Sequence, residues 1–203
     1  MNPAILPAQR RRIPTASATV GPFFPPQYFG LHDHDLTCID DPAQRARGQK
    51  IRISGRVFEA NRVPRWNCII ELWQADAGGC FAHPNDPRHA KADPNFMGWG
   101  RRLTDNQGNW EFVSVKPGGY ADPPTGARRA PHINLSLTGS GLMRRLVTTL
   151  FFEGEPSNAA EPVFSAIPDP KLRERLLLRP AGEGEYRIDI VLQGEDETPF
   201  FAD

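Results

Sequence analysis

A histidine and an asparagine two positions apart, His132 and Asn134, stand in a segment that alternates between polar and apolar residues. Such alternation predicts a β-strand, in which both side chains project from one face while Ile133 and Leu135 face the other way. Two histidines in this arrangement would suggest a metal site on a sheet, but here the second side chain is an amide. The pair is therefore a site, the remains of one, or the hydrated face of an ordinary strand.

Tyr120 precedes His132 by twelve residues and falls in the loop that leads into the same strand. A tyrosinate and an imidazole that lie close together can bind Fe(III), a hard ion that favours phenolate oxygen. The alternative is a histidine at the end of a strand that hydrogen-bonds to the neighbouring loop, which is the more common role. These two residues alone do not decide between the alternatives.

The other histidines form a second group of candidates. His32 and His34 alternate with aspartates in GLHDHDL at 30–36. Histidine and aspartate are good ligands for divalent metals, but a polar turn whose aspartates bind backbone amides is the more common structure. His83 and His89 lie in a long loop, where a histidine is more often solvated than a ligand.

The elements that must position these residues are mostly strands. Strands are predicted at 50–58, 67–74, 103–115 (two strands joined by an Asn-Gln-Gly-Asn turn), 132–138, 144–154, 186–194 and a last edge at 200–201. One helix is predicted at 168–178 from its proline-containing start and its leucines at helical spacing. The long irregular segment at 75–100 is of the kind that is often functional. The pattern predicts an all-β fold, an antiparallel β-sandwich with long loops and one short helix.

Length and composition indicate a single domain over residues 1–203, with an extended, proline-rich N-terminal arm at about 1–30. The chain has 24 basic and 24 acidic residues, which argues against a nucleic-acid partner. No run approaches the roughly 18 apolar residues of a membrane span. Three cysteines without metal-binding spacing, and no apolar segment typical of a signal peptide, favour a soluble cytoplasmic protein.

Longer segments of the sequence resemble the intradiol ring-cleaving dioxygenases. The matching segments include TVGPFF at 19–24, WQADAGG at 73–79, KPGGY at 116–120 and APHINLSL at 130–137, and similar stretches follow in order along nearly the whole chain. The resemblance implies a β-sandwich. It also implies that an active chain would hold Fe(III) with two tyrosines and two histidines.

Two of these four ligand positions have lost their donor in this sequence. The resemblance places the first tyrosine at Phe81 and the second at Tyr120, and the two histidines at His132 and Asn134. Phenylalanine offers no lone pair, and a neutral amide oxygen is a poor substitute for imidazole on Fe(III). We therefore expect no metal and no catalytic residue in this chain alone.

The resemblance instead implies the α subunit of a heteromeric dioxygenase that cleaves a dihydroxylated aromatic acid with O2. A homologous β subunit would bind the Fe(III), and the two subunits would form a higher αβ oligomer with the active site at their interface. The TVGPF segment matches a loop that lines that site, so the candidate substrate-binding residues are Thr19, Gly21, Pro22 and Phe23. A plain connector is the alternative for this segment.

The position of a family arginine that faces the substrate carboxylate is occupied here by Ser140. Arginines precede and follow this strand, and which of them binds the carboxylate, if any, stays open: Arg128, Arg129, Arg144 and Arg145. Two alternatives also stay open for the chain as a whole. One is a self-sufficient enzyme with a different metal set, such as His32 or His34 with His132, and the other is a non-enzymatic β-sandwich module for binding or assembly.

Overall fold

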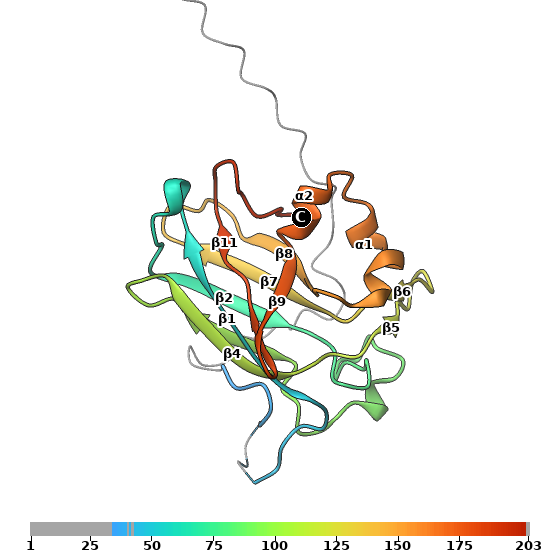
Figure 1. Cartoon of the computed structure of the whole chain (residues 1–203). Coiled ribbons are helices and arrows are strands. Elements are labelled where there is room, and N and C mark those ends of the chain that lie inside the picture. Colours follow the sequence, from blue (N-terminus) through green and yellow to red (C-terminus); the bar gives the residue numbers. More distant parts are fainter. Residues whose placement is uncertain (1–33, 40, 42, 202–203) are drawn as a thin grey trace, which may run out of the picture.

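Eleven strands and a few short helices make up the described part of the chain, which comprises residues 34–39, 41 and 43–201 of a computed structural model (Figure 1). The strands are β1 (Lys50–Phe58), β2 (Cys68–Trp73), β3 (Trp99–Leu103), β4 (Asn109–Val115), β5 (Tyr120–Ala121), β6 (Arg128–Arg129), β7 (His132–Gly139), β8 (Leu146–Phe152), β9 (Leu177–Gly182), β10 (Glu185–Arg187) and β11 (Ile190–Val191). The helices are α1 (Pro162–Ser165) and α2 (Pro170–Glu174), with 3₁₀ turns η1 (Ala60–Arg62), η2 (His89–Lys91) and η3 (Pro156–Ala160).

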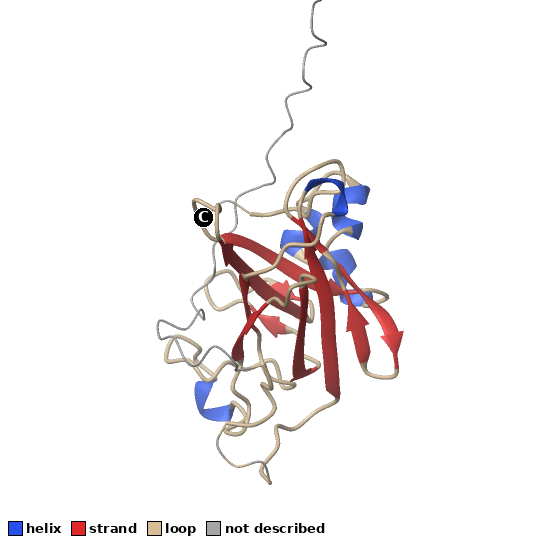
Figure 2. Cartoon of the chain, turned by 90° about the vertical axis from the view of Figure 1, so that its left-hand side faces the viewer, coloured by secondary structure: helices blue, strands red, loops and turns tan. Residues whose placement is uncertain are grey.

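Nine of these strands form one sheet that folds back on itself into two facing layers (Figure 2). One layer contains β4, β1, β10 and β11, the other contains β8, β7, β2 and β3, and β9 pairs with β10 of the first and with β8 of the second. The end strands β3 and β4 are joined by the short turn at 104–108, which brings the two edges of the sheet together. The predicted all-β fold is confirmed, although the pairings of β1 with β10, β1 with β11 and β8 with β9 are parallel.

The core lies between the two layers and follows the alternation of the sequence. One face of each central strand contributes fully or almost fully buried side chains: Ile51, Ile53 and Val57 from β1, Ile70 and Leu72 from β2, and Ile133, Leu135 and Leu137 from β7. Because successive residues of a strand face opposite ways, the same alternation sends His132 and Asn134 to the outer face of β7. Core packing therefore fixes the direction of both candidate site residues.

The predicted helix at 168–178 is only partly right. Helix α2 covers Pro170–Glu174, and its N-cap Asp169 accepts a hydrogen bond from the Lys171 N–H. Leu177 and Leu178 instead begin β9, which pairs in parallel with Phe151 and Phe152 of β8. Pairing with a buried strand outweighed the helical spacing of the leucines, because local propensity is a weaker effect than tertiary packing.

Other boundaries also differ from the sequence prediction. The strand expected at 186–194 is split into β10 and β11, and at the break the Asp189 carboxylate accepts a hydrogen bond from the Arg56 N–H. The segment at 75–100 contains η2 and the start of β3 at Trp99. Phe201 makes a single antiparallel bridge with Val147 rather than a full edge strand. The expected N-terminal arm lies outside the described residues.

Candidate functional site

Three of the four positions at which the sequence resemblance implies iron ligands come together at one end of the sandwich. Tyr120 begins β5, His132 begins β7, and Phe81 lies in the loop after β2. The Tyr120 hydroxyl oxygen lies 3.4 Å from His132 Nε2. The Phe81 and Tyr120 rings meet edge to face, with their centroids 5.3 Å apart. All three side chains are buried.

Two glycine-containing turns allow this approach. Gly79 has a φ of +75°, and a β-carbon there would lie 2.5 Å from the Gly119 carbonyl oxygen. At Gly118, a β-carbon would lie 2.6 Å from both the Ala77 carbonyl oxygen and the Gly79 nitrogen. Since real β-carbons do not approach other atoms so closely, only glycine fits where the turn before Phe81 packs on the turn before Tyr120.

Both polar groups of this site are held neutral. The Nδ1 atom of His132 lies 2.6 Å from the Ala130 carbonyl oxygen, so Nδ1 carries the proton and Nε2 presents its lone pair to Tyr120. Burial lowers the pKa of His132 to about 3, and the positive charge of Arg129 acts in the same direction. Burial raises the pKa of Tyr120 to about 12. At neutral pH the pair is a phenol beside an imidazole, not a tyrosinate.

Asn134 follows two residues later on the same face of β7. Its neighbours in register are Trp73 of β2 and Thr149 of β8. The Thr149 hydroxyl donates a hydrogen bond of 3.1 Å to Asn134 Oδ1. The amide oxygen is therefore already engaged within the sheet.

A buried carboxylate that the sequence reading missed holds the loop around Phe81. Asp86 is fully buried, and it accepts hydrogen bonds from the Phe81 N–H at 2.9 Å and the Arg88 N–H at 2.8 Å. The Arg88 guanidinium donates to the Gly79 carbonyl and lies 6.0 Å from the centroid of the Tyr120 ring. Asp86 could have been noticed from the sequence as the start of a turn, since aspartate often accepts the N–H two residues on.

Glu161 is a second residue that the sequence did not single out. Its carboxylate holds the backbone that leads into His132. Its carboxylate is fully buried and accepts hydrogen bonds from the Ala130 N–H at 2.7 Å and from Arg129 Nε at 2.8 Å. The same side chain caps α1 by accepting from the Val163 N–H. No pattern near Glu161 in the sequence connects it with His132, because 29 residues separate them.

The residues present do not fit Fe(III). Phe81 has no donor, the Asn134 oxygen is engaged by Thr149, and Tyr120 and His132 face each other in neutral form. Within residues 34–39, 41 and 43–201, no three His, Cys, Asp or Glu side chains are grouped so that they could hold a metal ion.

The other histidines that the structure describes take part in local hydrogen bonds. His83 Nδ1 accepts from the Asn85 N–H, and His89 Nδ1 lies 3.0 Å from the Asp86 carbonyl oxygen. His34 Nδ1 lies 3.5 Å from Arg102 of β3. His32 lies outside the described residues, as do the substrate-binding candidates Thr19, Gly21, Pro22 and Phe23.

Ser140 lies far from this group of residues. It is exposed in the turn after β7, and its carbonyl oxygen accepts a hydrogen bond from Arg65. Eight residues of strand separate Ser140 from His132, a span of roughly 26 Å at the usual rise of a strand. A role for Ser140 at a substrate would therefore concern a site on another chain.

Two of the arginines considered for the substrate carboxylate already face acidic partners. Arg129 pairs with Glu161, and Arg145 Nη2 lies 3.9 Å from the buried carboxylate of Glu71. Arg128 and Arg144 are exposed. Of the four arginines, Arg128 and Arg144 are therefore the more accessible to an external anion.

Comparisons with known proteins identify the family of this chain. The family model described as Dioxygenase matches residues 19–194. The chain is 37% identical to the protocatechuate 3,4-dioxygenase α chain of Pseudomonas putida, covering 77% of both chains, and 33% identical to the α chain from Burkholderia cepacia, covering 92% of this chain and 96% of that one. It is also 38% identical to the β chain of the Burkholderia cepacia enzyme, covering 88% of this chain and 79% of that one.

The comparison with solved structures also finds a dioxygenase. The dioxygenase domain of a dioxygenase–carbohydrate-binding fusion protein from Streptomyces sp. SirexAA-E superposes with a TM-score of 0.63 at 28% identity, covering 89% of this chain and 99% of that domain. The described residues include no helix that is long and apolar enough to cross a membrane. The chain belongs to the intradiol ring-cleaving dioxygenases, a family of oxidoreductases that use Fe(III).

Proposed function

We propose that this chain is the iron-free α subunit of a heteromeric protocatechuate 3,4-dioxygenase. The observation that carries the proposal is the state of the four ligand positions: Phe81 and Asn134 lack a suitable donor, and Tyr120 and His132 are paired in neutral form. Overall identity does not separate the subunits, since the values for the relatives named α and β are similar. The residues at the expected ligand positions support the assignment to α.

In this proposal a homologous β subunit binds the Fe(III), and the active site lies at the αβ interface of a higher oligomer. The iron would supply activation of the aromatic diol toward O2. The ring of protocatechuate would open between its two hydroxyl-bearing carbons to give 3-carboxy-cis,cis-muconate. A cytoplasmic location is part of the proposal, on the cysteine usage of the sequence.

In this proposal the chain contributes residues to the substrate pocket, which lies at the interface with the β subunit. The segment with Thr19, Gly21, Pro22 and Phe23 is the proposed lining, because a Gly-Pro turn presents backbone close to a ligand with little bulk. The turn at Ser140 is a second candidate contact. Its neighbour Arg144 is exposed and makes no ion pair within the described residues, so it is available to a carboxylate.

Expression of this chain alone and together with its β homologue tests the proposal. The chain alone should contain no stoichiometric iron, should lack the visible absorption of an Fe(III)–tyrosinate, and should not cleave protocatechuate. Co-expression should yield a complex with iron and activity. An isolated chain that binds iron and cleaves the ring would overturn the proposal.

A further inference from the structure

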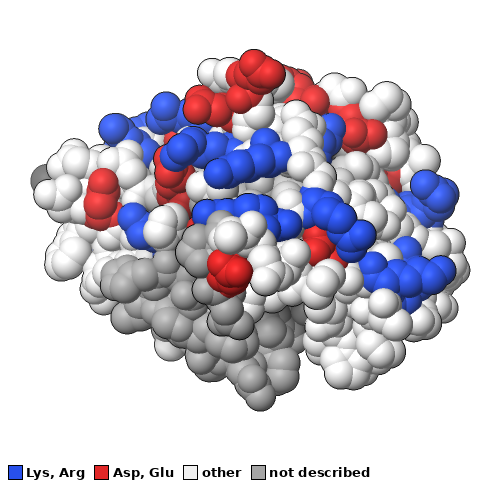
Figure 3. Space-filling view, turned by 90° about the horizontal axis from the view of Figure 1, so that it is seen from below, with Lys and Arg blue, Asp and Glu red and all other residues white. Residues whose placement is uncertain are grey.

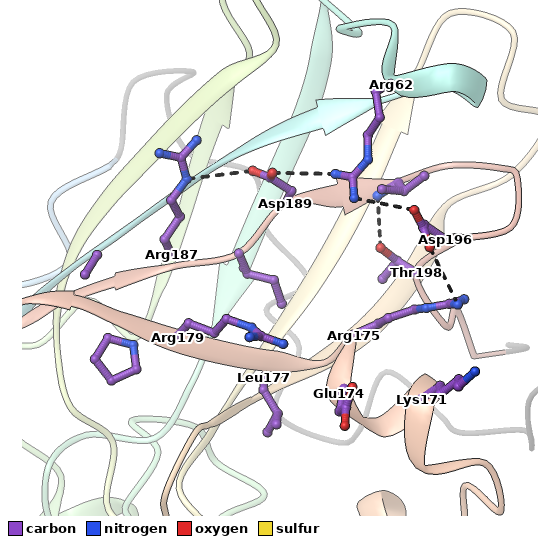
Figure 4. A pocket seen from close by; sticks show the side chains of 14 residues that line it. Arg62, Lys171, Glu174, Arg175, Leu177, Arg179, Arg187, Asp189, Asp196 and Thr198 are labelled. Carbon is purple, nitrogen blue, oxygen red and sulfur yellow. Dashed lines mark hydrogen bonds and ion pairs between the residues drawn. The ribbon is translucent and has the colours of Figure 1, made fainter.

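A basic groove lies on the outside of the sandwich, away from the residues of the candidate site. It has a volume of about 670 Å³ and is formed where the sheet opens between β9 and β11 (Figure 4). β9 and β10 pair as far as Arg179 and Arg187. Beyond that point the chain continues into β11, which pairs with β1, while β9 pairs with β8. We call this gap the β9–β11 groove.

Five cations and three carboxylates line the β9–β11 groove. The cations are Arg62, Lys171, Arg175, Arg179 and Arg187, and the carboxylates are Glu174, Asp189 and Asp196. Asp189 is shared by Arg62 and Arg187, with N–O distances of 3.7 and 3.9 Å. Asp196 is shared by Arg62 and Arg175 at similar distances. Two carboxylates therefore serve three arginines, each at a long N–O distance.

Arg179 is the residue that sets the groove apart. It makes no ion pair in the part of the chain that the structure describes, and it lies directly opposite Arg187 across the β9–β10 pair. Like charges at opposed positions of neighbouring strands destabilise a sheet. Basic side chains also form a band on the face seen in Figure 3, so positive charge alone does not mark a site. An arginine without an acidic partner among the described residues, set opposite a second arginine in a groove, does.

The arrangement of the cations favours an extended ligand with several carboxylates. Figure 4 shows Arg187 at one end of the groove, Lys171 at the other and Arg179 between them. Exposed ion pairs are weak in water, so a small anion at one arginine would gain little. A polypeptide segment would cover the groove, exclude water and offer successive carboxylates to the planar guanidinium groups. The apolar floor of Leu177, Ile188 and Val191 suits such cover.

We propose that the β9–β11 groove binds an extended acidic segment of a partner protein. The arginines bind its carboxylates, and the partner supplies the acidic group that Arg179 lacks among the described residues. The inference does not depend on the identity of the proposed substrate or on the position of the iron.

Fluorescence anisotropy with a labelled octapeptide of alternating glutamate and serine tests the proposal. The full-length chain is titrated at low salt, at which exposed charges are least screened. We expect saturable binding that Arg179→Glu weakens at least tenfold. The matched control Lys50→Glu makes the same change of charge at an exposed site outside the groove and should change binding less than twofold.

Stability provides a second readout. Arg179→Glu places a carboxylate opposite Arg187, so thermal unfolding should occur at the same or a higher temperature while peptide binding is lost. If Arg179 had a purely structural role, Arg179→Glu would instead lower the temperature of thermal unfolding. Equal losses in Arg179→Glu and Lys50→Glu, or no binding by the unmodified chain, would overturn the proposal. Displacement of the peptide by citrate at no higher concentration than the peptide itself would identify a small-anion site instead.

Discussion

His132 Nε2 lies 3.4 Å from the hydroxyl oxygen of Tyr120, and both side chains are buried. The two groups are buried and neutral, so the contact is a long hydrogen bond from phenol to imidazole. It supports packing between β5 and β7, and it has consequences for stability that can be measured.

The first prediction concerns the pH dependence of stability. Burial lowers the pKa of His132 to about 3 from an ordinary value of 6.5. Between these pH values the unfolded chain holds a proton that the folded chain does not, so the free energy of unfolding should fall as pH falls from 6.5 toward 3. His132→Gln should flatten this slope above about pH 4, as measured by urea unfolding.

The control for this experiment is His83→Gln, which removes a histidine of the loop after Phe81 instead of the buried one, and the change of slope should be larger in His132→Gln. Below about pH 4 both variants should still lose stability. The pKa of Asp86 is lowered because hydrogen bonds from Phe81 and Arg88 outweigh the effect of burial, and Asp93 behaves similarly. An unchanged slope in His132→Gln would contradict the neutral state assigned to His132.

The second prediction concerns the carboxylate of Asp86. Asp86→Asn replaces one of the two oxygens that accept backbone N–H groups in a buried place. We expect a loss of about 1–3 kcal/mol in the free energy of unfolding. Asp41→Asn is the matched control, because Asp41 also accepts the N–H two residues on but is exposed. Equal effects of the two substitutions would rule out the special role of Asp86.

The third prediction concerns Glu161. Glu161→Gln leaves the largely buried guanidinium of Arg129 without its carboxylate. Removing one member of a buried ion pair should cost about 3 kcal/mol in chemical unfolding. Glu155→Gln, which breaks a longer pair with Lys116, should cost about 1 kcal/mol or less. A Glu161→Gln variant as stable as Glu155→Gln would show that the pair is not important.

The fourth prediction concerns restoration of donors. The double variant Phe81→Tyr, Asn134→His restores the two donors that this sequence lacks at the expected ligand positions. We expect Fe(III) binding with visible tyrosinate absorption, and affinity lower by more than about tenfold in each single variant because each lacks one ligand. If the unmodified chain bound Fe(III) as tightly as the double variant, the proposed loss of the iron site would be contradicted.

Much of the fold could be predicted because a strand with one buried face alternates between apolar and polar residues. The alternation of β1 and β7 located the core and placed His132 and Asn134 on one outer face. β9 was missed because its first residues, Leu177 and Leu178, also fit a helical pattern. Only the long-range pairing with Phe151 and Phe152 decides between the two.

The candidate site was predictable only in part, and for a related reason. Tyr120 and His132 belong to recognisable motifs, and the structure brings them together as expected. Asp86 carries only the signal of a turn and Glu161 carries none, and their importance depends on burial and, for Glu161, on partners distant in sequence. The β9–β11 groove depends on strand register, which places Arg179 opposite Arg187.

Iron analysis of the separately purified chain, compared with its complex with the β homologue, tests the central claim most directly. The account predicts less than about one iron per ten isolated chains, and close to one iron per αβ pair in an active complex that cleaves protocatechuate. One iron per isolated chain, with ring cleavage abolished by His132→Gln, would contradict it.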